Sequence, residues 1–267
     1  MSDPRPIGVF DSGVGGLTVA GAIMAHAPDE PIVYLGDGAR FPYGSRPVEE
    51  IRSFGMELAG YLVNEGVKLL VVACNSVEVS AIGDIAAAHD VPVIGVVNPG
   101  ARAAVAATRN GVVGVLGTEA TIATGAYQRA LGSSVTLHAA ACPVFVEHIE
   151  RGDTSSDELR RAARGYLAPL EAGGVDTVIL GCTHYPLIAA LLGDELGPDV
   201  RLVSSAEETA RDVAGALAGS GATAPSGGAP AHRFLTTGDA GRFTALADLF
   251  LGHPVDQVET VAVGVAS

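Results

Sequence analysis

Lysine is almost absent from the 267-residue sequence: Lys68 is the single example, and arginine supplies the remaining strongly basic side chains. Lys68 opens the apolar run that leads to Cys74, so we expect it at the N-terminal end of a strand. Ligands of open α/β sheets collect outside the carboxyl ends of the strands instead. A pyridoxal phosphate enzyme holds its cofactor on a lysine as a Schiff base. We therefore expect chemistry without that cofactor, and we assign the chain no cofactor.

Cysteine, basic charge and long apolar runs are scarce as well. Three cysteines make no disulfide framework in a chain of this length, so we expect free thiols in a reducing compartment. No apolar run reaches the roughly 18 residues that span a bilayer, and the N-terminus begins no secretion signal, so we expect a cytoplasmic protein without membrane contact. The formal net charge of −14 opposes contact with phosphate backbones. We expect no nucleic-acid partner, whereas a protein partner stays open.

The sequence does contain an internal repeat. Residues 50–75 match residues 158–183 at a constant offset of 108, which aligns Ala73-Cys74-Asn75 with Gly181-Cys182-Thr183. A second register, at an offset of 106, aligns Gly8-Val9-Phe10 with Gly114-Val115-Leu116 and places Ser12 on Thr118. If the two copies fold alike and face each other, Cys74 and Cys182 meet across a pseudo-two-fold axis. Two thiols on opposite sides of one small molecule suit the inversion of a carbon centre.

Short apolar runs alternate with longer segments of helical period, which is typical of βα units and a parallel sheet. The predicted strands are Ile7–Phe10, Ile32–Leu35, Leu69–Ala73, Val93–Val97, Val112–Leu116, Val135–His138, Val178–Leu180, Arg201–Val203 and Arg233–Thr236. We predict an α/β fold of two pseudo-symmetric, doubly wound domains with mainly parallel sheets and an active site in the cleft between them. The first domain comprises residues 1–98 plus 206–267, and the second comprises residues 99–205. Residues 219–231 form a linker that is rich in Gly, Ala, Ser and Pro.

One helix of the second domain carries two local signals. Ser155 and Glu158 have the spacing of a capping box, which predicts the start of the helix there. Pro169 should kink or end the same helix, because proline donates no backbone hydrogen bond.

The glycine-rich segment Asp11-Ser12-Gly13-Val14-Gly15-Gly16 follows the first strand and opens a helix. Its glycines permit close approach of other groups, and the free N–H groups at a helix start bind anions. The spacing is not that of a nucleotide loop, and the lysine of a phosphate-binding loop is absent. A plain turn capped by Asp11 or Ser12 is the ordinary interpretation. Asp11 is also a candidate acceptor for a substrate ammonium.

Cys74 and Cys182 both stand where a buried strand is expected to meet the next helix. A thiol there lies near free N–H groups and the positive end of a helix dipole, which favours the thiolate. A single buried cysteine is usually inert. For two cysteines at matched positions, each followed by side chains that can hydrogen-bond a carboxylate, the functional interpretation is stronger. Cys142 has no counterpart in the repeat, and we expect it to fill core space.

His184 admits three interpretations: a metal ligand, a structural histidine, or a group that tunes the Cys182 thiol. The sequence has no C-x-x-C or H-x₃₋₅-H spacing to support zinc, so we predict no metal site. The segment Phe41-Pro42-Tyr43-Gly44-Ser45 follows another predicted strand and can supply an aromatic wall, a hydroxyl and a tight turn. His148 is expected to face solvent.

Taken together, these motifs closely resemble those of the glutamate racemases, a family of cofactor-independent aspartate/glutamate racemases. The resemblance is carried by four segments, which are Gly8–Gly16, Pro42-Tyr43-Gly44, Ala73-Cys74-Asn75 and Gly181-Cys182-Thr183-His184-Tyr185-Pro186. It extends from residue 7 to about residue 250. It implies interconversion of L- and D-glutamate, a role in supplying D-glutamate for peptidoglycan, and a homodimer.

The resemblance also implies roles for individual residues. Cys74 is the base that removes the α-proton of D-glutamate, and Cys182 is the base for L-glutamate. Glu150 matches a carboxylate near the second cysteine, and Asp11 and His184 are candidates to polarise the thiols of Cys74 and Cys182. The residues that match substrate contacts are Asp11, Ser12, Pro42, Tyr43, Gly44, Asn75, Ser76, Thr118, Thr183 and His184. Ser76 stands where threonine is more usual, and Glu147 stands where proline is frequent.

Other functions stay open at this point. A related racemase of aspartate or a hydantoin would share the paired cysteines. A thiol redox protein would need the two cysteines close enough to form a disulfide. A two-lobed binding protein would bind glutamate without chemistry. The resemblance also allows a secondary protein partner, DNA gyrase.

Overall fold

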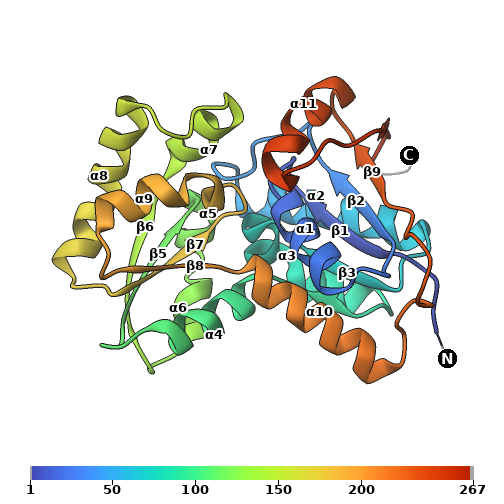
Figure 1. Ribbon diagram of the computed structural model, residues 1–267, viewed down its shortest axis with the longest axis horizontal. Coiled ribbons are helices and arrows are strands. Elements are labelled where there is room, and N and C mark those ends of the chain that lie inside the picture. Colours follow the sequence, from blue (N-terminus) through green and yellow to red (C-terminus); the bar gives the residue numbers. More distant parts are fainter. Residues whose placement is uncertain (1, 265–267) are drawn as a thin grey trace.

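The computed structural model describes residues 2–264, and every strand pairing in this range is parallel. The strands form two separate sheets, which occupy the right and left halves of Figure 1. The larger sheet has the order β10-β9-β2-β1-β3-β4, with bounds β1 Ile7–Asp11, β2 Ile32–Gly36, β3 Leu69–Val72, β4 Val93–Ile94, β9 Arg233–Thr236 and β10 Val258–Thr260. The smaller sheet has the order β6-β5-β7-β8, with bounds β5 Val112–Gly117, β6 Thr136–Ala141, β7 Thr177–Gly181 and β8 Arg201–Ser204.

The two sheets repeat one topology. The order β2-β1-β3-β4 in the larger sheet is the order β6-β5-β7-β8 in the smaller sheet, so β1 corresponds to β5 and β3 to β7. These are the correspondences that the offsets of 106 and 108 residues predict, and the α/β fold with two mainly parallel sheets is confirmed. Strand β10 was not predicted, because Val258–Thr260 is too short and too exposed to leave an apolar signal.

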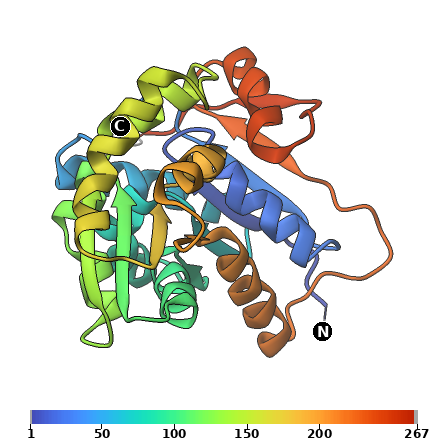
Figure 2. The same cartoon turned by 60° about the vertical axis from the view of Figure 1, so that its left-hand side comes forward.

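Helices cover the faces of both sheets. Their bounds are α1 Leu17–His26, α2 Val48–Asn64, α3 Asn75–Ala88, α4 Val97–Ala107, α5 Glu119–Ala123, α6 Ala126–Leu131, α7 Pro143–Glu150, α8 Asp157–Ala172, α9 Ala189–Leu196, α10 Ala206–Ser220 and α11 Ala240–Leu251, with a 3₁₀ helix η1 at Tyr185–Ile188. Helix α10 follows β8 of the smaller sheet and packs along α1 of the larger sheet. Residues 221–232 then form a long extended segment that leads to β9 (Figure 2).

The start and end of α8 differ from the sequence prediction. Ser156, rather than Ser155, caps the helix, because its hydroxyl accepts the backbone N–H of Leu159 at 3.1 Å. Pro169 lies inside α8 and neither ends nor breaks it. The proline is exposed and only three residues from the end of the helix, so a single hydrogen bond is lost near the helix end, and the buried Leu167 and Leu170 hold the turn against the core.

The predicted strand Val93–Val97 is also shorter than expected. Only Val93 and Ile94 pair with β3, and Val97 already begins α4. The carboxylate of Glu78, on α3, accepts the N–H groups of Val96 at 2.5 Å and Val97 at 2.9 Å. A cap supplied from a different helix ends the strand early, and no local sequence pattern announces it.

Candidate functional site

A cavity of about 200 Å³ lies where the carboxyl ends of β1 and β3 meet those of β5 and β7. Ligands of parallel sheets bind at this edge of the strands. The residues that line the cavity are Ser12, Phe41, Pro42, Tyr43, Gly44, Ser45, Cys74, Asn75, Ser76, Thr118, Glu119, Pro143, Val146, Glu147, Cys182, Thr183 and His184. Most of the predicted site residues are therefore brought together, and they come from both sheets.

Cys74 follows β3 and is the N-cap residue of α3. Its side chain is buried, with 6% of the residue surface exposed, and its Sγ lies 3.6 Å from Oγ of Ser12. Burial, together with the nearby charge of Asp11, raises the pKa of the Cys74 thiol to about 12. Cys74 is therefore a protonated thiol at neutral pH.

Cys182 follows β7 at the matching position, but the helix predicted to begin there does not: the 3₁₀ helix η1 starts only at Tyr185, with His184 as its N-cap. The neighbours of Cys182 also differ from those of Cys74. Its Sγ lies 3.9 Å from Nδ1 of His184, and Nε2 of His184 lies 3.2 Å from Oε1 of Glu150. Burial alone lowers the pKa of His184, but the hydrogen bonds to Cys182 and Glu150 outweigh it and raise this pKa to about 10. A histidine that stays protonated at neutral pH stabilises negative charge on the adjacent sulfur.

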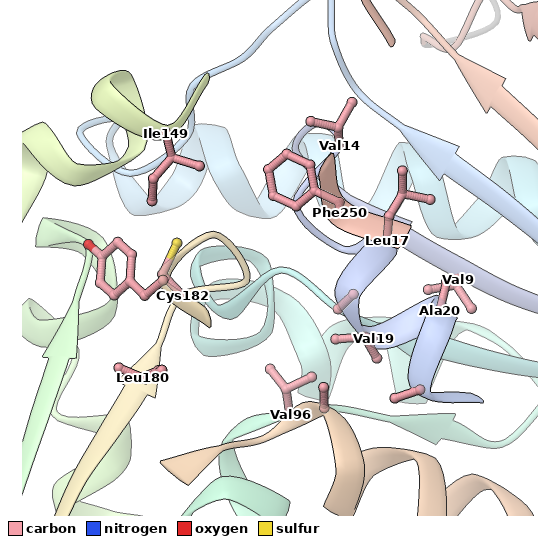
Figure 3. Packing of buried hydrophobic residues seen from close by; sticks show 14 of the residues in the cluster. Val9, Val14, Leu17, Val19, Ala20, Val96, Ile149, Leu180, Cys182 and Phe250 are labelled. Atoms are coloured by element: carbon pink, nitrogen blue, oxygen red, sulfur yellow. The ribbon is translucent and has the colours of Figure 1, made fainter. Parts of the chain in front are cut away.

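Figure 3 shows Cys182 at the end of its strand, with its sulfur directed toward the side on which Ile149 of α7 lies. Both cysteines that line the cavity are free thiols, as is Cys142. Cys142 is fully buried within the hydrophobic core and does not line the cavity, which confirms that it fills core space.

Asp11 and Glu150 stand behind the cavity wall rather than in it. Oδ1 of the fully buried Asp11 accepts the backbone N–H of Gly13 at 2.9 Å, and Oδ2 accepts the hydroxyl of Thr183 at 3.2 Å. Burial raises the pKa of Asp11. The hydroxyl of Ser12 lies 3.4 Å from Oδ1, so Asp11 reaches Cys74 through Ser12. Glu150 lines a smaller neighbouring cavity and reaches Cys182 through His184.

The glycine-rich loop after β1 packs closely against the segment that follows Cys182. A Cβ atom added at Gly15 would lie 2.4 Å from the His184 ring and from Oγ1 of Thr183. Only glycine therefore fits where this loop meets the segment after β7. The expected role of the loop as a place of close approach is confirmed. Neither Asp11 nor Ser12 caps α1, because the helix begins later, after Gly16.

Polar side chains also join the two halves on the first cysteine's side. Oγ of Ser76 lies 2.8 Å from Oγ1 of Thr118, which in turn accepts the N–H of Thr121 as the N-cap of α5. Nδ2 of Asn75 donates to the hydroxyl of Tyr127 at 2.9 Å. The hydroxyl of Tyr43 donates to Asp37, so the ring rather than the hydroxyl of Tyr43 is free to form the wall.

Several residues of the cavity were not predicted from the sequence. They are Glu119, Pro143, Val146 and Glu147. Phe41 and Ser45, from the predicted segment around the Pro42-Tyr43-Gly44 turn, also line the cavity, and Phe41 stacks on the His184 ring at 6.0 Å between centroids. Pro143 and Val146 lie one turn apart on α7 and so share a face. That spacing was a usable signal.

His148 was wrongly expected to face solvent. It is buried, and its Nδ1 lies 2.7 Å from Oδ2 of Asp153. Asp153 also accepts the hydroxyl of Ser156, the N-cap residue of α8. The loop between α7 and α8 folds back over the histidine, so this cluster holds the loop and does not belong to the cavity.

Two further structural observations concern residues 2–264. No cluster of three or more His, Cys, Asp or Glu side chains in this range could hold a metal ion. No helix in the same range has the length and apolar character that crossing a membrane requires.

The chain is similar to known proteins in both sequence and structure. The protein-family model described as Asp/Glu/hydantoin racemase matches residues 18–213. A glutamate racemase from Acidothermus cellulolyticus is 51% identical over 259 residues, which cover 96% of this chain and 98% of the relative. The structure is similar to that of a glutamate racemase isoform from Bacillus anthracis, with a TM-score of 0.92, 42% identity and 97% coverage of both chains.

A glutamate racemase from Francisella tularensis, solved in complex with D-glutamate, superposes with a TM-score of 0.91 at 32% identity and covers 97% of this chain and 98% of its own. The similarities span nearly the whole chain and include the strand ends that form the cavity. The chain therefore belongs to the Asp/Glu/hydantoin racemase family of isomerases, and within it to the glutamate racemases.

Proposed function

We propose that the protein interconverts L- and D-glutamate without a cofactor, using the thiols of Cys74 and Cys182 as two bases. The observation that carries this proposal is the pairing of the two cysteines: they stand after equivalent strands of the two repeated sheets and line the same cavity. The relative from Francisella tularensis was solved with D-glutamate, which supports a substrate of this size and charge.

The reaction inverts a carbon next to a carboxylate. With L-glutamate bound, the Cys182 thiolate takes the α-proton, the electron pair of the C–H bond passes to the α-carbon and its carboxylate, and the Cys74 thiol then donates its proton to the opposite face. The products are D-glutamate, a Cys182 thiol and a Cys74 thiolate. The reverse direction starts from that second state, so one thiol and one thiolate are needed at once.

The surroundings of the two cysteines support this division of labour in the free protein. Burial raises the pKa of the Cys74 thiol, which favours its protonated form, whereas the Cys182 sulfur lies 3.9 Å from Nδ1 of the His184 imidazolium. This asymmetry supports Cys74 as the acid and Cys182 as the base when L-glutamate reacts. Asp11 contacts Ser12, which contacts Cys74. We propose that Asp11 in this way promotes the reprotonation of the Cys74 thiolate to the thiol.

The described residues that line the cavity include no lysine or arginine. The substrate carboxylates are therefore held by neutral donors, which are the side chains of Ser12, Asn75, Ser76, Thr118 and Thr183 and the N–H groups at the starts of α3 and α5. These neutral donors can stabilise the charge that develops at the α-carboxylate, and the buried His184 imidazolium adds a cation on the Cys182 side of the same cavity.

From the family resemblance we also propose a pathway, a location, an oligomeric state and a division into domains. The protein supplies D-glutamate for peptidoglycan, works in the cytoplasm, forms a homodimer and is built from two domains, residues 1–98 plus 206–267 and residues 99–205. The division is supported by the sheets, because β1–β4, β9 and β10 fall in the first set and β5–β8 in the second.

The test is proton NMR of L-glutamate with the protein in D₂O and no added cofactor, followed together with optical rotation. At early times we expect one α-proton to be lost for each molecule of L-glutamate that is inverted. Stable binding of glutamate without α-deuterium uptake would contradict the proposal and favour a binding protein. Faster exchange on L-aspartate than on L-glutamate would favour an aspartate racemase of the same family.

A further inference from the structure

The C-terminal helix α11 reaches the site from outside the matched family segment. That segment ends at residue 213, whereas α11 spans Ala240–Leu251 and follows β9 at the edge of the larger sheet. The helix packs on α1 and on β10, so it belongs to the half of the molecule that carries Cys74. Two of its side chains nevertheless contact groups on the Cys182 side of the cavity.

The first contact is an ion pair between Arg242 and Glu150. Nη2 of Arg242 lies 2.6 Å from Oε2 of Glu150, while Oε1 of the same carboxylate lies 3.2 Å from Nε2 of His184. Only 7% of the Glu150 side chain is exposed. The carboxylate is thus held between two cationic groups, one on each oxygen, and its orientation toward His184 is fixed by Arg242.

The second contact is made by Phe250, at the other end of α11. Its ring meets the His184 ring edge-on, at 5.1 Å between centroids and 81° between planes. Phe41 stacks on the same imidazole. The histidine is therefore confined by two aromatic rings, and its remaining freedom is the direction of its Nε2–H, which Glu150 accepts.

The position of Arg242 is itself set locally. Asp239 is the N-cap residue of α11, and its Oδ1 accepts the backbone N–H of Arg242 at 2.6 Å. The cap fixes the first turn of the helix, and with it the direction in which the Arg242 side chain leaves the backbone. The first turn lies beside the small cavity that Glu150 and Arg242 line together.

We propose that Arg242 is a positioning residue for Cys182, acting through Glu150 and His184. The inference rests on the proposed two-thiol function and adds to it a residue from outside the matched family segment. Without Arg242, Oε2 of Glu150 loses its partner and the carboxylate can rotate into the neighbouring cavity. His184 then loses the acceptor that orients it, and negative charge on the Cys182 sulfur is less well stabilised. A longer path also leads from Nδ1 of His184, 3.4 Å from Oγ1 of Thr183, through Asp11 and Ser12 to Cys74. Because His184 contacts Cys182 directly, we expect the larger effect at Cys182.

Because Arg242 acts mainly on Cys182, its replacement should change the kinetic isotope effects of the two enantiomers differently. The equilibrium constant of a racemisation is one, so kcat/KM must fall equally in both directions in any variant. The isotope effects need not change together. In Arg242→Ala, proton transfer at Cys182 becomes more rate-limiting, so the effect of α-deuteration should rise with L-glutamate and fall with D-glutamate.

The experiment compares Arg242→Ala, Arg242→Lys and a matched control, Arg102→Ala, in full-length protein. Arg102 is also an exposed arginine in an ion pair between helices, with Asp212, and it does not line the cavity. We expect kcat to fall about tenfold in Arg242→Ala, to recover to within about threefold of wild type in Arg242→Lys, and to stay unchanged in Arg102→Ala. If Arg242→Ala does not fold, Arg242→Gln takes its place.

A double-variant cycle with Glu150→Gln separates positioning from a general structural effect. If Arg242 acts through Glu150, adding Arg242→Ala to Glu150→Gln should change kcat less than twofold. An undiminished tenfold loss in that background, or isotope effects that move equally for the two enantiomers, would overturn the proposal. Wild-type protein without α-proton exchange on glutamate would instead refute the underlying function, so the two failures are distinguishable.

Discussion

Ser76 and Thr118 share a hydrogen bond of 2.8 Å that joins the segment after β3 to the segment after β5. The hydroxyl of Thr183 donates to Asp11 at 3.2 Å, and this bond joins the segment after β7 to the end of β1. Because β1 corresponds to β5 and β3 to β7, the two bonds join equivalent pairs of segments, although the residues differ by one position: the offsets place Thr183 on Asn75 and Ser12 on Thr118. The two halves are therefore joined by a buried side-chain hydrogen bond beside each cysteine.

The first prediction concerns the bond between Ser76 and Thr118. Replacing Ser76 by Ala removes one partner and leaves a buried hydroxyl with fewer contacts. We expect the free energy of unfolding to fall by about 1 kcal/mol and KM for glutamate to rise severalfold, because both groups also line the cavity. Urea titration and initial rates measure the two effects. Ser76→Thr, which keeps the hydroxyl, is the matched control, and equal effects of both variants would contradict the role of the bond.

The second prediction concerns the two bases. Cys74→Ser and Cys182→Ser should each lower racemisation by at least about 100-fold, because a serine hydroxyl is far less acidic than a thiol. Cys74→Ser should keep α-proton exchange on L-glutamate, and Cys182→Ser should keep it on D-glutamate. Cys142→Ala is the control, since Cys142 is buried in the core. Full turnover by either serine variant would refute the two-base mechanism.

The fold and the pairing of the two cysteines could be predicted from the sequence because both leave local patterns that occur twice. Apolar strands with a matched Cys at each end are visible without knowing any long-range contact, and parallel topology places their ends at one edge. The position of Asp11 was less predictable. Its carboxylate accepts the N–H of Gly13 only two residues away, which turns it away from the cavity, and this depends on the conformation of the loop.

Contacts between distant segments were invisible in the sequence. Glu78 caps a helix that begins 19 residues later, and Arg242 contacts a carboxylate 92 residues earlier. Neither pair has a spacing that a helical or strand pattern would select. The rim residues Glu119 and Glu147 show the same limit, because exposed glutamates at a helix start or end are ordinary until the cavity beside them is known.

The third prediction follows from the pKa of His184, which its hydrogen bonds to Cys182 and Glu150 raise to about 10 against the effect of burial. The imidazolium is the active form, so kcat/KM should be limited at high pH by its loss of a proton as the pH approaches 10. His184→Gln keeps a donor near Cys182 but cannot titrate. We expect its activity to fall by about 100-fold and its dependence on pH in this range to disappear. An unchanged alkaline limb in His184→Gln would assign the limb to another group.

The last prediction concerns Glu78 and the stability of the protein. Burial raises the pKa of the Glu78 carboxyl from 4.5 to about 7, even though two backbone N–H groups favour the ionised form. Between these pH values the native state binds more protons at this site than the unfolded state, so the free energy of unfolding falls as the pH rises and levels off above 7.

Glu78→Gln removes this titration and leaves an oxygen that can accept the N–H groups of Val96 and Val97. Between pH 5 and pH 8, the stability of wild type relative to Glu78→Gln should therefore fall by about 2 to 3 kcal/mol. Urea titrations at the two pH values measure the difference, in which the other titrating groups cancel. Glu171→Gln, at an exposed glutamate, is the control. The difference in stability between wild type and Glu171→Gln should be the same at the two pH values. If the difference between wild type and Glu78→Gln were also independent of pH, the prediction would be wrong. The N–H groups at the start of α4 would then compensate fully for the burial of the ionised Glu78 carboxylate.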